Sequence, residues 1–240
     1  VTPFVVFSSA LAAGMLVPVF MVVRPLPCLG DFLVLVFIFS LGRFFLSLSA
    51  LDTASAFGGM GASREMFISS LVEPALCMVI FTLSLHFGST DLYVLREAHS
   101  IPLSSIVAAV VLFLVDIAET SRIPVDNQET HLELTMVHEA MVLEYSGSSL
   151  ALIELASSIK QMIFFYLIAQ ILFPVGLPNG DMVQILLWGG WYITRIVLIA
   201  CVVAVVEVSI SKMRLFRAAD FLGFAFVLGI IAALCALLGA

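Results

Sequence analysis

The chain has 240 residues, of which 62% are apolar and only 11% are charged, and its formal net charge is −7. A soluble domain is roughly 45–50% apolar and about 25% charged, so this composition excludes a soluble globular enzyme and a disordered chain. The acidic balance also excludes an ordinary nucleic-acid-binding protein, which carries a basic patch. The expected solvent is a bilayer, and at about 20 residues per crossing the chain has room for seven or eight crossings.

Seven apolar runs are long enough, or nearly so, to span a membrane. We expect them to be helices, because a helix satisfies its own backbone hydrogen bonds in lipid. The predicted fold class is therefore all-α, a polytopic membrane helix bundle of about seven transmembrane helices in a single integral membrane domain over 1–240. The predicted spans are residues 1–23, 32–51, 66–87, 101–118, 150–173, 182–210 and 221–238.

The first run starts at Val1 with no basic segment before it. We interpret this start as an interior point of a longer protein and not as a signal peptide. The basic residues of the loops predict the orientation, since the side richer in Lys and Arg faces the cytoplasm. The longest loop, residues 121–147, then faces the cytoplasm. The richer side holds Arg64, Arg122, Lys212, Arg214 and Arg217, and the other side holds Arg24 and Arg96.

The long loop and the end of the run before it are unusually acidic. Residues 116–144 contain seven of the 17 acids, and Glu129 and Glu133 are spaced to lie on one side of an amphipathic helix. One interpretation is a solvated acidic loop. A docking surface for a protein partner, or an entrance for protons, explains the density of acids better, because an anionic membrane repels them. His131 and His138 are interpreted as interface residues, since no third ligand has matching spacing.

Charged residues also fall inside the apolar runs, where each costs about 2.5–3.5 kcal/mol and therefore tends to mark an ion or proton path. Glu73 lies eight residues into its run and precedes Pro74, which indicates a wet cavity. Glu207 lies near the end of a run and is interpreted as an ion-paired or snorkelling residue. The other charges inside or just beyond the runs are Arg43, Asp116, Glu119, Glu154, Lys160 and Arg195.

The fifth run carries a polar stripe. Glu154, Ser157, Ser158 and Gln161 recur at helical spacing, with Lys160 beside them. A carboxylate and an ammonium in one helix are typical of a proton relay, so we interpret Glu154 and Lys160 as a pair in the pathway. The four cysteines show no CxxC or metal spacing, so the chain offers no recognisable iron–sulfur, zinc or disulfide framework. No motif of a catalytic site of its own is visible either.

A signature in the long loop resembles that of the proton-pumping NADH dehydrogenase subunit 1 family, which reads approximately E-T-N-R-x-P-F-D and then E-Y-S-G. This chain has Glu119-Thr-Ser-Arg-Ile-Pro-Val-Asp126 and Glu144-Tyr-Ser-Gly147, with Ser121 in place of Asn and Val125 in place of Phe. The amino-acid sequence between the two motifs is similar to that of the family branch found in group 4 membrane-bound [NiFe] hydrogenases. The stretch 61–73 and the segment 212–223 also resemble family motifs. Family members usually begin with one more helix and a basic loop, which are absent from this sequence.

The resemblance implies a membrane anchor with no cofactor of its own. This anchor is expected to dock a peripheral arm that carries the [NiFe] centre and iron–sulfur clusters, beside antiporter-like membrane subunits. Two alternatives stay open: the quinone-chamber subunit of a respiratory complex, and a secondary ion transporter. We predict a proton or ion pathway of Glu73, Asp116, Glu119, Glu154, Lys160 and Arg195. The predicted peripheral-arm interface comprises Arg64, Arg122, Asp126, Glu129, Glu133, Glu139 and Glu144.

Overall fold

The structure is a computed structural model that describes residues 1–18, 30–94, 102–123, 125–126, 137–174, 182–210 and 215–239. Within these ranges every regular element is a helix, apart from an isolated backbone bridge between Asp31 and Asp91. The helices are α1 (Thr2–Leu16), α2 (Phe32–Asp52), α3 (Ala56–Phe87), α4 (Leu103–Glu119), α5 (His138–Val142), α6 (Ser148–Leu172), α7 (Met182–Ser209) and α8 (Leu215–Leu237).

Five of these helices are long and apolar enough to cross a membrane: α2, α3, α6, and most of α7 and α8. The helix α1, with 15 residues, is a shorter apolar helix, and α4 has 17 residues. The prediction of an all-α polytopic membrane bundle is therefore confirmed.

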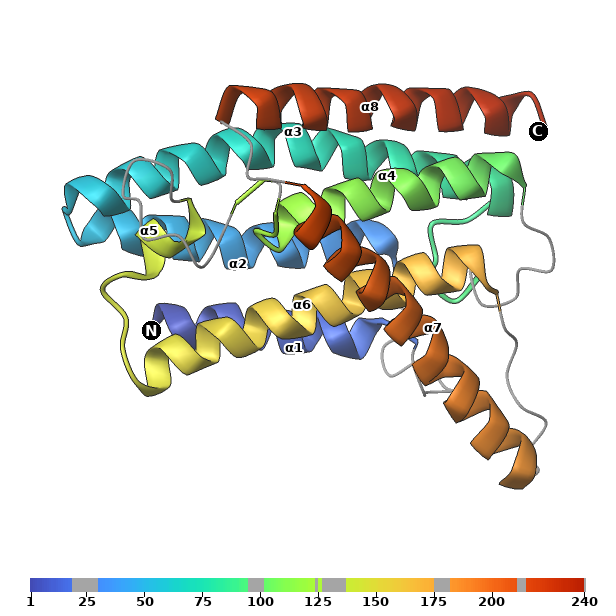
Figure 1. Cartoon of the computed structure of the whole chain (residues 1–240), viewed down its shortest axis with the longest axis horizontal. Helices are drawn as coiled ribbons and strands as arrows, with labels where there is room; N and C mark the ends of the chain where they lie inside the picture. Colours follow the sequence, from blue (N-terminus) through green and yellow to red (C-terminus); the bar gives the residue numbers. More distant parts are fainter. Residues whose placement is uncertain are drawn as a thin grey trace.

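The long helices other than α7 lie roughly side by side, and α7 crosses them obliquely (Figure 1). In the figure α8 lies along the top edge above α3 and α4, while α1 and α6 form the opposite edge with α2 between. The helix α3 packs on α2, α4 and α8, and α1 packs on α2 and α6. The helix α7 packs mainly against α6. Only 17% of an 18-residue apolar stretch within its candidate membrane span, Leu186–Ser209, is buried.

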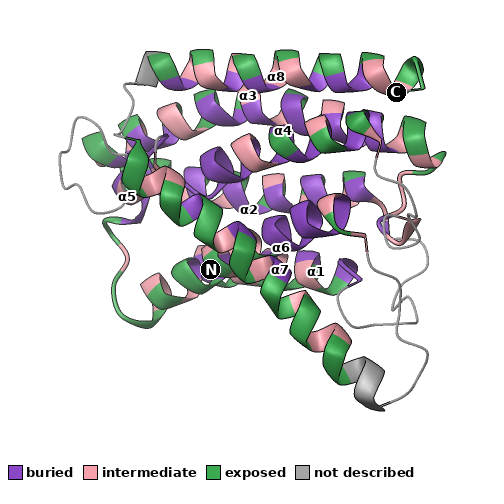
Figure 2. Ribbon diagram, turned by 45° about the vertical axis from the view of Figure 1, so that its right-hand side comes forward, coloured by how far each residue is buried: buried purple, intermediate pink, exposed green. Residues whose placement is uncertain are grey.

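Aliphatic and aromatic side chains form the core and fill the space between the helices that lie side by side. Leu76, Val79, Leu112, Phe164 and Leu167 are all nearly or completely buried. The outward faces are apolar as well, with green exposed stripes along α7 and α8 in Figure 2. Val208 of α7, for example, is 89% exposed. An apolar outer face of this extent fits a protein whose surroundings are lipid.

The helix α3 starts ten residues earlier than the apolar run predicted, at Ala56. The hydroxyl of Ser55 accepts a hydrogen bond from the Gly58 backbone N–H at 3.1 Å and so caps the helix. The helix continues through Pro74 to Phe87 and ends at Gly88, which has φ +70°. This early start adds almost three turns at the end of the bundle where α5 lies, and these turns carry part of the site.

Candidate functional site

The hairpin of α2 and α3 places a buried arginine beside a carboxylate. Nη2 of Arg43 lies 2.9 Å from Oε1 of Glu73. The hydroxyl of Ser40 donates to the same oxygen at 2.9 Å and accepts a hydrogen bond from Arg43 at 3.1 Å. The Glu73 side chain is 46% exposed, whereas that of Arg43 is 10% exposed. The pair therefore extends from the surface of the bundle toward its interior.

A second carboxylate, from α4, binds the other nitrogen of the same guanidinium. Nη1 of Arg43 lies 2.8 Å from Oε2 of Glu119 and donates to the Ser69 hydroxyl at 3.0 Å. The Glu119 side chain is only 2% exposed. A buried carboxylate needs a paired charge and hydrogen bonds to stay ionised, and Arg43 provides both.

A lysine from α6 completes the arrangement on the far side of Glu119. Nζ of Lys160 lies 3.0 Å from Oε1 of Glu119 and donates to the Glu119 backbone carbonyl at 3.2 Å. The same ammonium lies 5.5 Å from the centre of the Phe39 ring, within cation–π range. Glu73, Arg43, Glu119 and Lys160 thus form one continuous series of opposite charges, which we call the charge chain.

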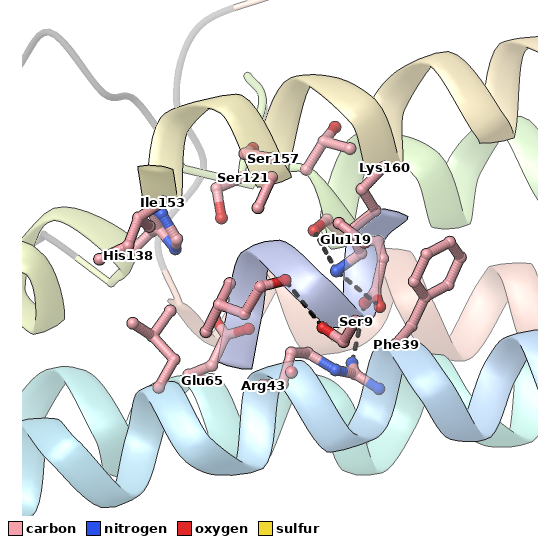
Figure 3. A pocket seen from close by; sticks show the side chains of 16 residues that line it. Ser9, Phe39, Arg43, Glu65, Glu119, Ser121, His138, Ile153, Ser157 and Lys160 are labelled. Carbon is pink, nitrogen blue, oxygen red and sulfur yellow. Dashed lines mark hydrogen bonds and ion pairs between the residues drawn. The ribbon is translucent and has the colours of Figure 1, made fainter. Parts of the chain in front are cut away.

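Arg43, Glu119 and Lys160 of the charge chain line a small, partly open cavity of about 60 Å³, which we call the inner cavity. Glu65, Ser121 and His138 line this inner cavity with Glu119 and Lys160. Figure 3 shows His138 and Ile153 toward one end, and Glu119, Lys160 and Phe39 toward the other. A cavity needs only about 10–15 Å³ to hold a water molecule, so this one has room for water between the buried charges.

A larger polar cavity of about 260 Å³ lies beside the inner one. Arg122, Glu139 and Glu154 line this outer cavity, together with His138 and Ser157, which line the inner cavity as well. Arg122 also reaches across to α6 and α7: it donates to Gln161 at 2.9 Å and lies 3.6 Å from a Glu207 carboxylate oxygen. The prediction that Glu207 is ion-paired is therefore confirmed.

The short helix α5, which carries His138, is fixed by two contacts. Oδ2 of Asp126 accepts hydrogen bonds from the backbone N–H groups of Val137 and His138 at 3.2 and 3.1 Å. On the other side α5 rests on Gly61 of α3, where an added Cβ would lie 2.9 Å from Cβ of Ala140. Burial lowers the pKa of His138 below its ordinary value, and Lys160 acts in the same direction while Glu139 opposes it.

The expected pairing of Glu154 with Lys160 is wrong. Lys160 pairs with Glu119, while Glu154 is exposed and lines the outer cavity. The two residues are six apart, which places them about 120° from each other around a helix with 3.6 residues per turn. The serines and Gln161 of the predicted stripe do follow Glu154: Ser157 and Ser158 line the same cavity, and Gln161 binds Arg122.

Two other predicted pathway residues stand apart from the charge chain. Asp116 lies one turn before Glu119, is completely buried, and has no hydrogen-bond partner for either carboxylate oxygen within the described part of the chain. Arg195 of α7 donates to the backbone carbonyl of Phe173 at the end of α6. Arg195 therefore joins two helices, and the structure does not bring it to Glu119.

The residues predicted to face a peripheral arm differ in exposure. Glu144 is exposed, Arg64, Arg122 and Glu139 are half-buried, and Asp126 is 1% exposed. Glu129 and Glu133 lie outside the described residues. The described members all belong to the segment 122–144 or to the early turns of α3, on which α5 packs. They gather at one end of the bundle, the end on which the outer cavity lies.

Sequence reasoning missed two members of the site. Arg43 was noted as a charge inside the membrane but was not assigned to the pathway, and Glu65 was not singled out at all. A signal for Glu65 exists in the sequence: Glu65, Ser69 and Glu73 follow one another at intervals of four residues, which places them along one stripe of α3. The early start of α3 brings Glu65 into the helix and onto that stripe.

Possible metal ligands and cysteines also occur in the described residues outside the charge chain. Among the residues that the structure describes, no group of three or more His, Cys, Asp or Glu side chains is placed to hold a metal ion. The described cysteines are Cys77, Cys201 and Cys235, and all three are free thiols.

The structure is that of a polytopic membrane protein with charges buried between α2, α3, α4 and α6. Comparison with known proteins gives its family. The chain belongs to the family described as NADH dehydrogenase, which matches residues 1–238. The family suggested by the signature at 119–147 is thereby confirmed.

Two Escherichia coli proteins are similar over much of the chain. Hydrogenase-4 component C is 35% identical over 178 residues, covering 72% of this chain and 56% of that protein. Formate hydrogenlyase subunit 4 is 31% identical over 227 residues, covering 89% of this chain and 71% of that protein. The chain thus spans little more than half of the first relative. The fold is also that of a chain in the solved structure of an archaeal membrane-bound sulfane sulfur reductase, with a TM-score of 0.75 and 15% sequence identity. The match covers 98% of this chain and 78% of that chain.

Proposed function

We propose that this chain is the membrane anchor and ion-coupling subunit of a group 4 membrane-bound [NiFe] hydrogenase of the formate hydrogenlyase kind. In this proposal it docks a peripheral electron-transfer arm at the end of the bundle formed by α5 and the start of α3. It then links the redox reaction of that arm to the movement of protons or sodium ions across the cytoplasmic membrane. The acidic segment 121–147 faces the cytoplasm.

The charge chain is the observation that carries this proposal. Arg43 and Lys160 hold Glu119 between them at 2.8 and 3.0 Å, at a depth where an unpaired charge is costly. Protonation of Glu119 would weaken its attraction to both cations, so the proton occupancy of one site changes the pairing across α2, α4 and α6. A redox event in a docked arm moves an ion only if it favours one of these pairing states over the other.

The partners in this proposal follow from its chemistry. A hydrogenase large and small subunit and an iron–sulfur subunit form the arm, and antiporter-like membrane subunits adjoin the bundle. The [NiFe] centre and the iron–sulfur clusters belong to the arm. The two E. coli relatives support this proposal, because their names assign them to hydrogenase-4 and to formate hydrogenlyase.

The assembly is tested by isolating the native complex in mild detergent through this subunit and measuring nickel and iron. We expect about one nickel per chain, accompanied by iron. Iron and flavin without nickel, in an intact complex, would instead point to the respiratory complex, and an isolated chain without metal to a lone transporter. Either result would overturn the proposal.

The coupling role is tested with Glu73→Gln, because Glu73 is the half-exposed end of the charge chain and its loss disturbs packing least. In liposomes that contain the complex, we expect normal redox turnover with a reduced number of ions moved per turnover. Asp220→Asn, at an exposed position of α8 outside the charge chain and the predicted arm interface, is the matched control and should couple normally. Unchanged coupling in a fully assembled Glu73→Gln complex would exclude Glu73 from the pathway.

A further inference from the structure

The two polar cavities are next to each other, and His138 lies between them. It lines both the inner cavity, with Glu65 and Glu119, and the outer cavity, with Glu139 and Glu154. Ile153 and Ser157 of α6 are the other residues that line both. Ile153 is apolar and 2% exposed. Of these three side chains, only the histidine both binds and releases a proton near neutral pH.

The backbone of His138 is held firmly while its ring is left available. Its N–H group is bound by the buried Asp126 carboxylate at 3.1 Å, and its helix is packed onto Gly61. Among the side chains that line the inner cavity, Figure 3 draws no hydrogen bond to the His138 ring. A neutral imidazole has one nitrogen that donates a hydrogen bond and one that accepts, so the ring is suited to exchange protons with water on two sides.

We propose that His138 is the proton relay between the outer cavity and the buried carboxylates of the inner cavity, with Glu65 as the first acceptor. The inference rests on the proposed function, since it assumes that protons enter at this end of the bundle. In each transfer one ring nitrogen accepts a proton that water in the outer cavity relays from the aqueous phase. The other ring nitrogen releases its proton through water in the inner cavity to the Glu65 carboxylate, which becomes a carboxylic acid. The ring is neutral before and after but has exchanged its N–H nitrogen, and a ring flip returns it to the starting tautomer.

The surroundings of the ring agree with this role. Burial and the Lys160 ammonium favour the neutral ring, which can accept a proton, and nearby carboxylates limit this effect. The inner cavity, at about 60 Å³, has room for the bridging water. The titratable and charged groups around His138 are Asp126 before α5, Glu139 on α5, Glu154 and Lys160 on α6, Glu65 on α3, and Arg122 in the outer cavity.

The test measures the rate of proton-coupled turnover in liposomes that contain the native complex. His138→Gln keeps a polar side chain of similar reach but cannot relay a proton, and it should slow turnover about tenfold or more. His86→Gln, the same substitution at an exposed position in the last turn of α3 that lines neither cavity, is the control and should stay near the wild-type rate. Retention of the arm by both variants is measured in the same preparations, so that a docking defect is recognised.

Chemical rescue separates a relay from a structural role. His138→Ala removes the ring and leaves space beside the outer cavity, and added imidazole should restore most of the lost rate. A wild-type rate in His138→Gln, or a slow His138→Ala complex that imidazole does not accelerate, would overturn the relay. Neither result would affect the proposed function, which fails on separate results: an intact complex without nickel, or a wild-type complex that moves no ions.

Discussion

Arg43 is the centre of the charge chain because its guanidinium contacts two carboxylates at once. Its two terminal nitrogens bind Glu73 and Glu119 at 2.9 and 2.8 Å, and both also bind serines. A planar fork of donors suits this bridging, whereas an ammonium is a single point charge. The identity of this side chain as arginine, and not only its positive charge, is therefore required.

Arg43→Lys should lower both stability and coupling. The lysine ammonium satisfies at most one of the two carboxylates well, and the other is left in a buried site without its partner. Breaking a buried pair costs about 3–5 kcal/mol, and since the charge is kept we expect a loss of about 1–3 kcal/mol. Unfolding in detergent measures it. Arg217→Lys, at an exposed position of α8, is the control, and equal stability of the two variants would contradict the bridging role.

The lowered pKa of His138 predicts that the folded protein loses stability as the pH falls. Its pKa is lowered in the folded chain from 6.5, chiefly by burial. The unfolded chain therefore binds a proton at this ring before the folded chain does, and the stability contributed by the neutral ring falls as the pH falls below about 6.5. The decline ends once the pH is below the lowered pKa, where both states are protonated.

His138→Gln should remove this part of the acid sensitivity. Thermal unfolding of wild type and variant, measured from pH 8 to pH 5 at constant ionic strength, gives the comparison. We expect the difference in free energy of unfolding between the two proteins to change below about pH 6.5, with the wild type losing more. Parallel curves over the whole range would show that the ring titrates alike in both states.

At the scale of elements, the position of α5 depends on a glycine in the neighbouring helix. A Cβ at Gly61 would lie 2.9 Å from Ala140 and 3.0 Å from the carbonyl of Val137, both in or beside α5. Real Cβ atoms do not approach so closely, so one of the two segments must move. The first residue of the stretch 61–73, which resembles a family motif, thus has a packing reason to be glycine.

Gly61→Ala should therefore destabilise the chain by about 1–3 kcal/mol, the usual cost of overpacking, although alanine is the better helix former. Gly59→Ala is the matched control, because a Cβ there meets nothing within 4 Å. We expect this control to gain up to about 1 kcal/mol from helix propensity. If both variants gain stability, α5 is not held against α3 in the manner described.

Most of the membrane helices were predictable from the sequence, and the features that were missed have physical causes. Long apolar runs predict α2, α6, α7 and α8 well, because length and hydropathy alone determine a membrane span. The start of α3 was missed because residues 56–65 mix glycine with charged Arg64 and Glu65, which ends an apolar run without ending a helix. The partner of Lys160 was missed for another reason: Glu119 is 41 residues away, and no local spacing predicts a contact between helices.

At the scale of the whole molecule, the polar features are concentrated at one end and the sides are apolar. The inner and outer cavities, α5 and most of the predicted arm interface belong to that end, while α7 and α8 present exposed aliphatic faces (Figure 2). In the proposed function this end meets the peripheral arm, and the acids of the segment 121–147 supply the complementary charge.

Glu129→Lys combined with Glu133→Lys should release or weaken the peripheral arm, because two reversed charges place repulsion where complementary charge is expected. The ratio of arm subunits to this chain after purification measures the effect, and it should become more sensitive to salt. Asp220→Lys, at an exposed position on α8, serves as the control. An unchanged ratio in the double variant would assign both acids to a solvated surface.

The order in which the charged helices occur along the chain also affects how the protein enters the membrane. Arg43 and Glu73 belong to the hairpin of consecutive helices α2 and α3, so the countercharge of Arg43 follows on the very next helix. Glu119 arrives next on α4, while Lys160 follows only with α6. Between the insertion of α4 and that of α6 the charge chain therefore carries one excess negative charge. The arrival of Lys160 is the step at which the charge chain becomes electrically neutral.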